Sequence, residues 1–349
     1  MQTQKHILLF SKFEMNIHLP NYFCNIFLMI FIFINLGNEA MAIEESSNSN
    51  MLEIHHVEWV KNWPSSENKK KNIKDYLNSI VLGMKHSKLN KPVSVFANNL
   101  NEFWVLDQGG NIVFKVNNNV GDIPHQLIKA NINLSSVVGI CSDKKSKIFF
   151  TDSQTNKIYW FSSDNKKLLL FNDTLKLEQP TGIAYFPERK EIWVVETKAH
   201  RITVLNEKGE LVKRIGSRGD AHGEFNYPTH IWIDKGGVIY ITDAMNFRVQ
   251  VLSSDGYVIS VFGEAGDASG YFARPKGIAT DSYGNIYIVD ALFNVVQVFN
   301  KDGVFLYSFG SQGRDNQQFW MPSGIFIDQE NYIYVADTYN SRIQIFQLK

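Results

Sequence analysis

The stretch IYIVDALFNVVQVF, Ile286–Phe299, recurs in altered form five more times along the chain. In each copy an apolar segment ends at an acidic residue, four residues form a turn, and a second apolar segment follows. Successive acidic residues lie 44 to 47 positions apart. So regular a period indicates a fold built from equivalent units. The acidic residues are Asp107, Asp152, Glu196, Asp243, Asp290 and Asp337.

Outward from this stretch, residues 276–310 predict four short strands. Runs of β-branched and aromatic residues are separated by turns rich in Asn, Asp and Gly, which is typical of antiparallel strands. One such unit cannot bury both of its faces, but six units arranged radially cover one another and enclose a central channel. The sequence therefore predicts an all-β fold, a six-bladed β-propeller of four-stranded antiparallel blades.

The last repeat lacks a fourth strand, because the chain ends at QIFQLK. Three other repeats end their fourth strand at Gly216, Gly263 and Gly310. The segment DYLNSIVLG, residues 75–83, ends in the same way. We therefore predict that an N-terminal strand, residues 75–82, completes the last blade and protects its open edge.

The last three units resemble NHL repeats, most clearly over residues 222–349. The matching words include GYFARPKGIATDSYGNIYIVD and IYVADTYNSRIQIF. The chain is similar to the exported six-bladed NHL propellers of bacteria. This resemblance implies export and a binding or scaffolding role, although a fold alone does not determine an activity.

The N-terminal residues have the pattern of a targeting segment. Residues 24–36 are apolar but short for a membrane span, and Ala40-Met41-Ala42 fits a cleavage site. We interpret residues 1–42 as a signal peptide, or alternatively an uncleaved anchor, and residues 43–74 as a polar linker before a propeller at 75–349. The predicted location is periplasmic or extracellular, with membrane attachment only through an uncleaved N-terminal segment.

Composition argues against several kinds of site. The 35 basic residues balance the 35 acidic ones, which does not favour nucleic acid as a partner. Cys24 lies in the apolar N-terminal run and Cys141 in another apolar run, so no disulfide or cysteine-based metal site is expected. No cofactor is predicted.

The repeated acidic residues could suggest a metal or catalytic ring, but a structural role is favoured. A carboxylate at the end of a strand can accept hydrogen bonds from the adjacent turn. It can also pair with a basic residue five positions on. That position holds Lys157, Arg201, Arg248 or Arg342. Asn246 and Asn340 are expected to be turn residues.

Candidate ligand-binding residues lie near the start of the first strand of each repeat. His230 in YPTHIWID occupies a position that holds glycine in most repeats, and His86 and His222 lie in loops on the same predicted face. Arg274 and Lys276 favour an anionic group there. A metal site requires three or four close ligands, and the equivalent positions do not supply them. They hold Ser94, Gly139, Gly182, Gly277 and Gly324.

Apolar residues at the turn tips predict a protein-binding patch. Such residues would be solvated unless a partner covered them. The alternative is that they fold back onto neighbouring blades as packing. The candidates are Met245, Phe247, Leu292, Phe293 and Tyr339.

These observations favour a non-enzymatic exported propeller that binds another envelope or secreted protein, or a ligand, through the loop-bearing face. The alternative is a propeller enzyme, a lyase or lactone-type hydrolase, with a metal in the channel. Resemblance to peptide-amidating propeller lyases would require several inward histidines, and here only His230 occupies an inward position.

Overall fold

A computed structural model describes residues 56–65, 89–117, 125–126, 134–162, 168–171 and 174–349. Contacts divide the chain into residues 1–53 and 54–349, and every described residue belongs to the second unit. The predicted signal peptide, 1–42, and His86 lie outside the described residues. No helix in the described part is long and apolar enough to cross a membrane.

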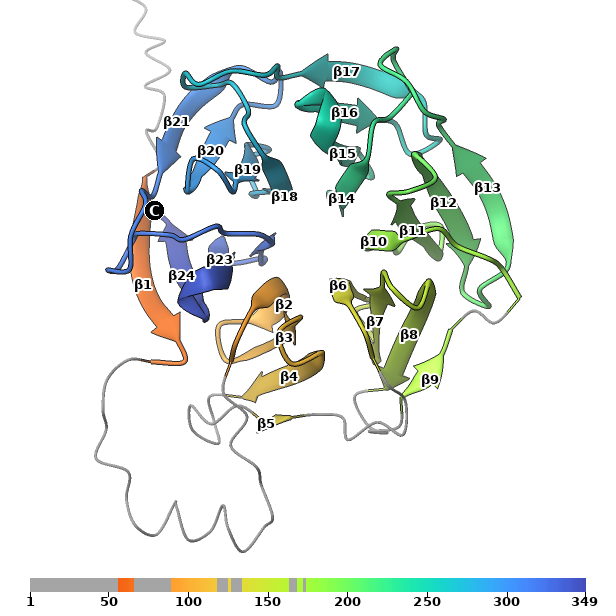
Figure 1. Ribbon diagram of the computed structural model, residues 1–349, viewed down its shortest axis with the longest axis horizontal. Coiled ribbons are helices and arrows are strands. Elements are labelled where there is room, and N and C mark those ends of the chain that lie inside the picture. Colours follow the sequence, from red (N-terminus) through yellow and green to blue (C-terminus); the bar gives the residue numbers. More distant parts are fainter. Residues whose placement is uncertain (1–55, 66–88, 118–124, 127–133, 163–167, 172–173) are drawn as a thin grey trace, which may run out of the picture. The chain divides into compact units, whose positions relative to one another are not determined.

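The described strands form six four-stranded antiparallel sheets arranged in a ring (Figure 1), which confirms the predicted propeller. Blade 1 contains β2 (Pro92–Asn99), β3 (Glu102–Asp107), β4 (Ile112–Asn117) and β5 (His125–Gln126). Blade 2 contains β6 (Val137–Ser142), β7 (Lys147–Asp152), β8 (Lys157–Ser162) and β9 (Leu169–Leu170). Blade 3 contains β10 (Pro180–Phe186), β11 (Glu191–Glu196), β12 (Arg201–Asn206) and β13 (Leu211–Ile215).

The remaining blades repeat this order from the channel outward. Blade 4 contains β14 (Pro228–Ile233), β15 (Ile239–Asp243), β16 (Arg248–Leu252) and β17 (Val258–Phe262). Blade 5 contains β18 (Pro275–Thr280), β19 (Ile286–Asp290), β20 (Val295–Phe299) and β21 (Phe305–Phe309). Blade 6 contains β22 (Ile325–Ile327), β23 (Tyr332–Asp337), β24 (Arg342–Leu348) and β1 (Val57–Trp63).

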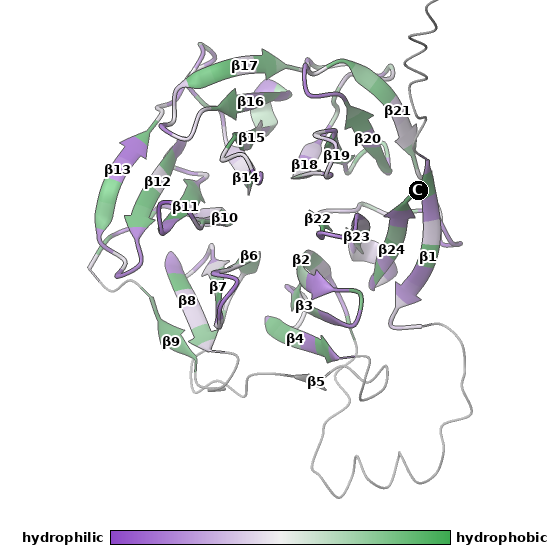
Figure 2. Ribbon diagram, turned by 180° about the vertical axis from the view of Figure 1, so that it is seen from behind, coloured by the Kyte–Doolittle hydropathy of each residue, from purple (hydrophilic) through white to green (hydrophobic). Residues whose placement is uncertain are grey.

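The hydrophobic core lies between the blades rather than at one centre. Six buried clusters occur in the described residues, one at each contact between neighbouring blades. Between blades 3 and 4, for example, fully buried Trp193 belongs to the same cluster as Ile239 and Leu252. Hydrophobic stretches accordingly run through the strands of every blade (Figure 2). Each blade therefore depends on its neighbours to bury its faces.

An N-terminal strand closes the ring, but it is not the predicted one. β1 pairs antiparallel with β24, from Val57 opposite Leu348 to Trp63 opposite Ile343. The predicted segment, 75–82, lies outside the described residues, and residues 57–63 of the supposed linker form the strand instead. Packing of Trp63 favours residues 57–63 as the closing strand. Its buried ring lies edge-on to Phe103 and Phe114 of blade 1, with centroids 5.6 Å from that of Phe103 and 6.3 Å from that of Phe114.

The loops that carry the chain into blades 4, 5 and 6 share one conformation. Each begins at a glycine after a fourth strand and reaches a buried phenylalanine that lies against that glycine. Gly310, for instance, has φ of 96° and lies against Phe319, so a side chain there would be strained and would meet the ring. These loops cross the face from which the first strands start.

Candidate functional site

The acidic residue that ends each second strand is buried in every blade and has a structural role. Asp290 shows the pattern, because its carboxylate accepts hydrogen bonds from the backbone N–H groups of Ala273, Arg274, Leu292 and Phe293. The carboxylate therefore ties the loop entering a blade to the hairpin tip of the same blade. Ion pairs also form with three of the predicted basic residues, Arg201, Arg248 and Arg342.

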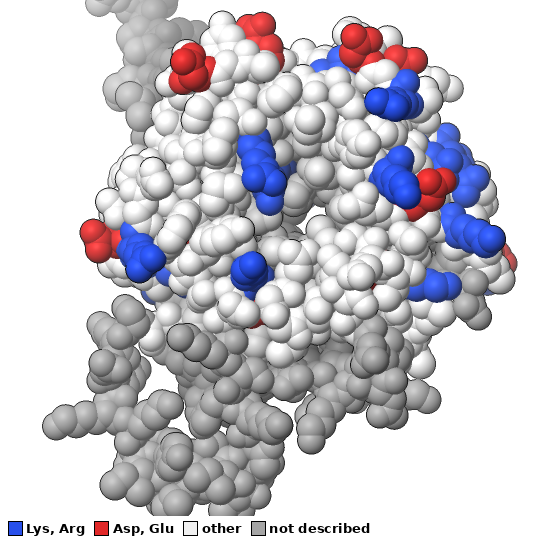
Figure 3. All heavy atoms as spheres, in the orientation of Figure 1, with Lys and Arg blue, Asp and Glu red and all other residues white. Residues whose placement is uncertain are grey.

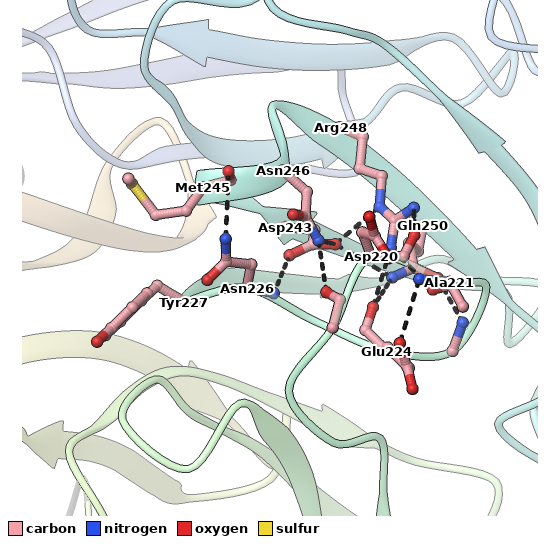
Figure 4. A network of polar contacts seen from close by, with 12 residues as sticks. Asp220, Ala221, Glu224, Asn226, Tyr227, Asp243, Met245, Asn246, Arg248 and Gln250 are labelled. Carbon is pink, nitrogen blue, oxygen red and sulfur yellow. Dashed lines mark hydrogen bonds and ion pairs between the residues drawn. The ribbon is translucent and has the colours of Figure 1, made fainter.

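In blade 4 this carboxylate belongs to a larger network (Figure 4). Arg248 donates to Asp243 at 2.8 Å and to the backbone carbonyls of Asp220, Ala221 and Glu224. The buried Gln250 also donates to Asp243 and to the Glu224 carbonyl. The network therefore joins the hairpin of blade 4 to the loop that enters this blade.

The hairpin tips between second and third strands adopt one repeated turn. In blades 4 and 6 the turn contains a short 3-10 helix, η2 (Ala244–Asn246) and η3 (Thr338–Asn340). The turn prediction would give Asn246 and Asn340 left-handed backbone angles, but these residues do not adopt them. Those fall on the next residues, Phe247 and Ser341, while each Asn side chain bonds a loop carbonyl and the acidic residue.

Apolar side chains are exposed on the tips and entry loops of blades 4, 5 and 6, and five of them lie on the tips or immediately beside the first strands. Three of them, Met245, Leu292 and Tyr339, are 54%, 57% and 52% exposed. The structure adds Tyr227 and Trp320, which precede the first strands of blades 4 and 6 and which sequence reasoning missed. The ring of Trp320 lies beside that of Tyr339, with centroids 6.0 Å apart. We call these five residues the tip patch.

The two phenylalanines predicted for the same patch are only partly exposed. Phe247 is partly buried and packs against the buried cluster between blades 4 and 5. Its position two residues beyond Met245 places it at the base of the turn, where the chain re-enters the blade. Phe293 is half-buried beside the exposed Leu292.

Basic side chains border the tip patch on blades 6 and 1. The Lys91 ammonium lies 5.5 Å from the Tyr339 ring centre, and the Arg314 guanidinium lies 4.8 Å from that of Trp320. On the face seen in Figure 3, Lys and Arg lie both beside the mouth of the channel and toward the edges, while Asp and Glu lie mainly near the edge.

The channel contains a cavity of about 560 Å³ that is lined by the innermost strands of all six blades. Its wall includes one aliphatic side chain from the same position of each blade. We call this ring the aliphatic collar, and it consists of Val95, Ile140, Ile183, Ile231, Ile278 and Ile325.

His230 lines the same cavity, immediately before the collar residue Ile231. Glycines at the equivalent position are required by close contact between blades. At Gly182, a Cβ atom would lie 2.8 Å from the Thr229 carbonyl oxygen and 2.9 Å from the His230 Cα. These positions therefore face the next blade as well as the channel. A side chain fits there only where the backbone of the next blade approaches less closely.

The predicted ligand residues separate into two sets. His230 and Lys276 are both half-buried, and burial, followed by the Lys276 charge, lowers the pKa of His230 to about 3. Burial, followed by the Arg274 charge, lowers the pKa of Lys276 to about 8. Arg274 is exposed at the entry to the same strand. His222 is exposed on the loop that leads to blade 4 and is not brought to this group by any contact in the structure.

Within the part of the chain that the structure describes, no three His, Cys, Asp or Glu residues are grouped so that they could hold a metal ion. His230 lies among glycine, serine and aliphatic positions, and its Nδ1 atom is 3.0 Å from the Thr229 hydroxyl. The arrangement suits binding through hydrogen bonds and charge.

Two family matches agree with this geometry. Residues 168–261 match the family described as "6-bladed beta-propeller", and residues 319–346 match the NHL repeat. The chain is a six-bladed β-propeller that contains an NHL repeat. Among curated proteins, none matches the sequence significantly.

Solved structures with this propeller fold have varied descriptions. An auxiliary nutrient binding protein from Bacteroides thetaiotaomicron is 15% identical, with a TM-score of 0.60 over 75% of this chain and 70% of that one. Virginiamycin B lyase from Staphylococcus aureus is 16% identical, with a TM-score of 0.56 over 75% and 98%. The nidogen/laminin complex includes a chain that is 18% identical, with a TM-score of 0.54 over 70% and 84%. At these identities the likeness establishes the fold alone.

Proposed function

We propose that this propeller is an exported binding protein that holds a protein partner on the tip face of blades 4, 5 and 6. The observation that supports it is an asymmetry at one repeated position. The second residue of the hairpin tip is Met245, Leu292 or Tyr339 in these blades, whereas blades 1 to 3 have a glycine or a polar residue. Blades 1 to 3 fold without an apolar residue at this tip position, so the fold itself does not explain why blades 4 to 6 have one.

The tip patch has the composition of a binding surface. Aromatic and methionine side chains are enriched where proteins meet, and a few of them supply most of the binding energy. Beneath the tips, Asp290 accepts a hydrogen bond from the backbone of its own hairpin, and Asp337 accepts one from the loop that enters blade 6. A surface that is already ordered loses little entropy on binding.

The basic side chains at the border define the partner further. Lys91 and Arg314 lie over the rings of Tyr339 and Trp320, so their charges face the edge of the patch. We infer that the partner presents an apolar segment flanked by acidic residues, because opposite charges around an apolar centre favour correct docking. Export and the periplasmic or extracellular location belong to this proposal.

The proposal is tested with the double variant Met245→Asp, Leu292→Asp of the full chain. Binding partners would be captured by crosslinking in the native host and identified, and the affinity of the recovered partner would be measured. We expect the affinity to fall at least 30-fold, because two apolar contacts worth about 1–2 kcal/mol each are lost.

The matched control is Gln154→Asp, which places the same residue at the equivalent tip of blade 2. It should leave the affinity and the unfolding temperature unchanged. If the double variant binds as tightly as the unaltered protein, the partner does not use the tip patch. If the double variant fails to fold, these side chains are part of the core and the proposal is wrong.

A further inference from the structure

A separate feature of the channel, which does not depend on the tip patch, is an uneven pattern of side-chain size along its wall. In each blade one residue of the first strand directly follows the aliphatic collar residue. This residue is aromatic in blades 1, 4 and 6 and small in blades 2, 3 and 5. The aromatic residues are Phe96, Trp232 and Phe326, and the small ones are Cys141, Ala184 and Ala279. All three aromatic residues line the cavity, and we call them the aromatic wall.

The aromatic wall is continuous, because the Trp232 ring crosses blade 5. Its indole N–H donates to the Thr280 hydroxyl of blade 5 at 2.8 Å, and its ring centroid lies 5.4 Å from that of Phe326 in blade 6. The Phe326 ring in turn lies 5.1 Å from that of Phe96 in blade 1. Trp232 and Phe326 are partly exposed and line the cavity, so part of their apolar surface is open to a molecule in the channel.

Carboxylates lie at the end of the channel opposite the tip face. Asp234, Asp281 and Asp328 follow the first strands of blades 4, 5 and 6, and all three line the cavity. No ion pair between described residues includes any of them. Asp234 is half-buried, and its two oxygens accept one hydrogen bond each, from the Val238 N–H and the Tyr240 hydroxyl. A carboxylate has about four acceptor sites, so Asp234 can still accept a donor from a ligand.

The charges along the cavity wall favour a cation. These three aspartates and Glu188 line it, against the two ammonium groups of Lys144 and Lys235. Both lysines are exposed and their charges are therefore screened by solvent, whereas Asp281 and Asp328 are buried. A cation that enters the channel would stabilise these carboxylates, because buried charges are favourable only when they are paired.

We propose that the channel binds an organic ammonium ion that carries an aromatic group. The ammonium donates to Asp234, and the aromatic group packs against Trp232 and Phe326. Trp232 and Asp234 are two positions apart, so they project to the same side of the chain and can contact one ligand together. The cavity of about 560 Å³ has the size of a small-molecule site.

The test measures binding of four probes to the full chain at pH 7 by calorimetry and ligand-observed NMR. The probes are phenethylammonium, its neutral isostere 2-phenylethanol, the anion 3-phenylpropanoate, and methylammonium. Phenethylammonium should bind about tenfold or more tightly than 2-phenylethanol, which lacks the charge, and than methylammonium, which lacks the ring. 3-Phenylpropanoate should bind most weakly, because its charge has the same sign as the cavity wall. The proposal is wrong if any of these three binds as tightly as phenethylammonium, or if phenethylammonium does not bind at about 10 mM.

Two variants examine the residues on which the proposal depends, each with a control elsewhere on the propeller. Asp234→Asn should weaken phenethylammonium binding about tenfold but keep 2-phenylethanol binding within about twofold, whereas Trp232→Leu should weaken both about fivefold or more. The exposed controls Asp302→Asn and Tyr257→Leu should change neither. Normal binding of phenethylammonium to folded Asp234→Asn or Trp232→Leu would overturn the proposal. If a variant fails to fold, the probes still decide on the unaltered protein, because equal binding of the charged and neutral probes contradicts the proposal.

Discussion

Replacing Gly182 with alanine would add one methyl group where blades 3 and 4 touch beside the channel. Its carbon would lie 2.8 Å from the Thr229 carbonyl oxygen and 2.9 Å from the His230 Cα. Both neighbours are backbone atoms, so they cannot turn aside as a side chain would. The first strands of the two blades would have to separate.

The size of the effect follows from what holds those strands together. The Thr181 hydroxyl donates to the same Thr229 carbonyl at 2.9 Å and lies 2.7 Å from the Thr197 hydroxyl. Overpacking costs about 1–3 kcal/mol, and the loss of a buried hydrogen bond adds about 1 kcal/mol. We therefore expect Gly182→Ala to lower the free energy of unfolding by about 2–4 kcal/mol.

The assay is equilibrium urea unfolding together with thermal unfolding, where the midpoint should fall by roughly 5–15 °C. Gly236→Ala is the matched control, because Gly236 is exposed in a turn of blade 4 and a Cβ there meets only a side-chain oxygen at 3.3 Å. The control should be neutral or slightly stabilising. Equal stability of the two variants would refute the argument that the glycine positions exist for blade-to-blade contact.

Three further predictions concern buried polar groups. Arg248→Met should destabilise the protein by about 3 kcal/mol in urea unfolding, because Asp243 stays buried without its cation; an unchanged midpoint would contradict this. Lys276→Met should be more stable than the unaltered protein at pH 7, by at most about 3 kcal/mol. The pKa of Lys276 in the folded protein, about 8, is below the ordinary 10.5, so the unaltered protein gains stability as pH rises through this range. The difference in unfolding free energy between the two proteins should therefore shrink in urea titrations from pH 8 to 10.5. A constant difference would refute this prediction. The Cys141 thiol should react with a thiol reagent only at the rate of unfolding, because burial raises its pKa and hides it; rapid labelling of the folded protein would disprove this.

The regular features of the fold could be read from the sequence because each blade repeats the same local rule. The acidic residue at the end of the second strand marks every hairpin, and its role follows from its position beside unpaired N–H groups. The closing strand could not be found in this way. Residues 57–63 have no glycine after them, and their register with β24 is interrupted between Trp59 and Lys61. Trp63 is buried by packing against aromatic rings of blade 1, which come much later in the sequence.

The candidate site was only partly predictable for a related reason. Met245 and Phe247 look equivalent in the sequence as apolar residues of one turn, yet only Met245 is exposed. Phe247 has the left-handed backbone conformation of the turn, and the sequence does not show which turn position adopts it. Trp320 and Tyr227 were missed because their loops meet the tips through contacts between separate segments, such as the bonds from Tyr339 N–H to the Trp320 carbonyl and from Met245 N–H to the Asn226 carbonyl.

The closing strand also has a consequence for synthesis. Residues 57–63 are made early, whereas β24, their strand partner among the described residues, is made much later. β1 must therefore wait without this partner until residues 342–348 have been synthesised. Pairings so distant in sequence slow folding. Completion of blade 6 thus requires both segments: a chain truncated before Arg342 leaves β1 without β24 and blade 6 unfinished.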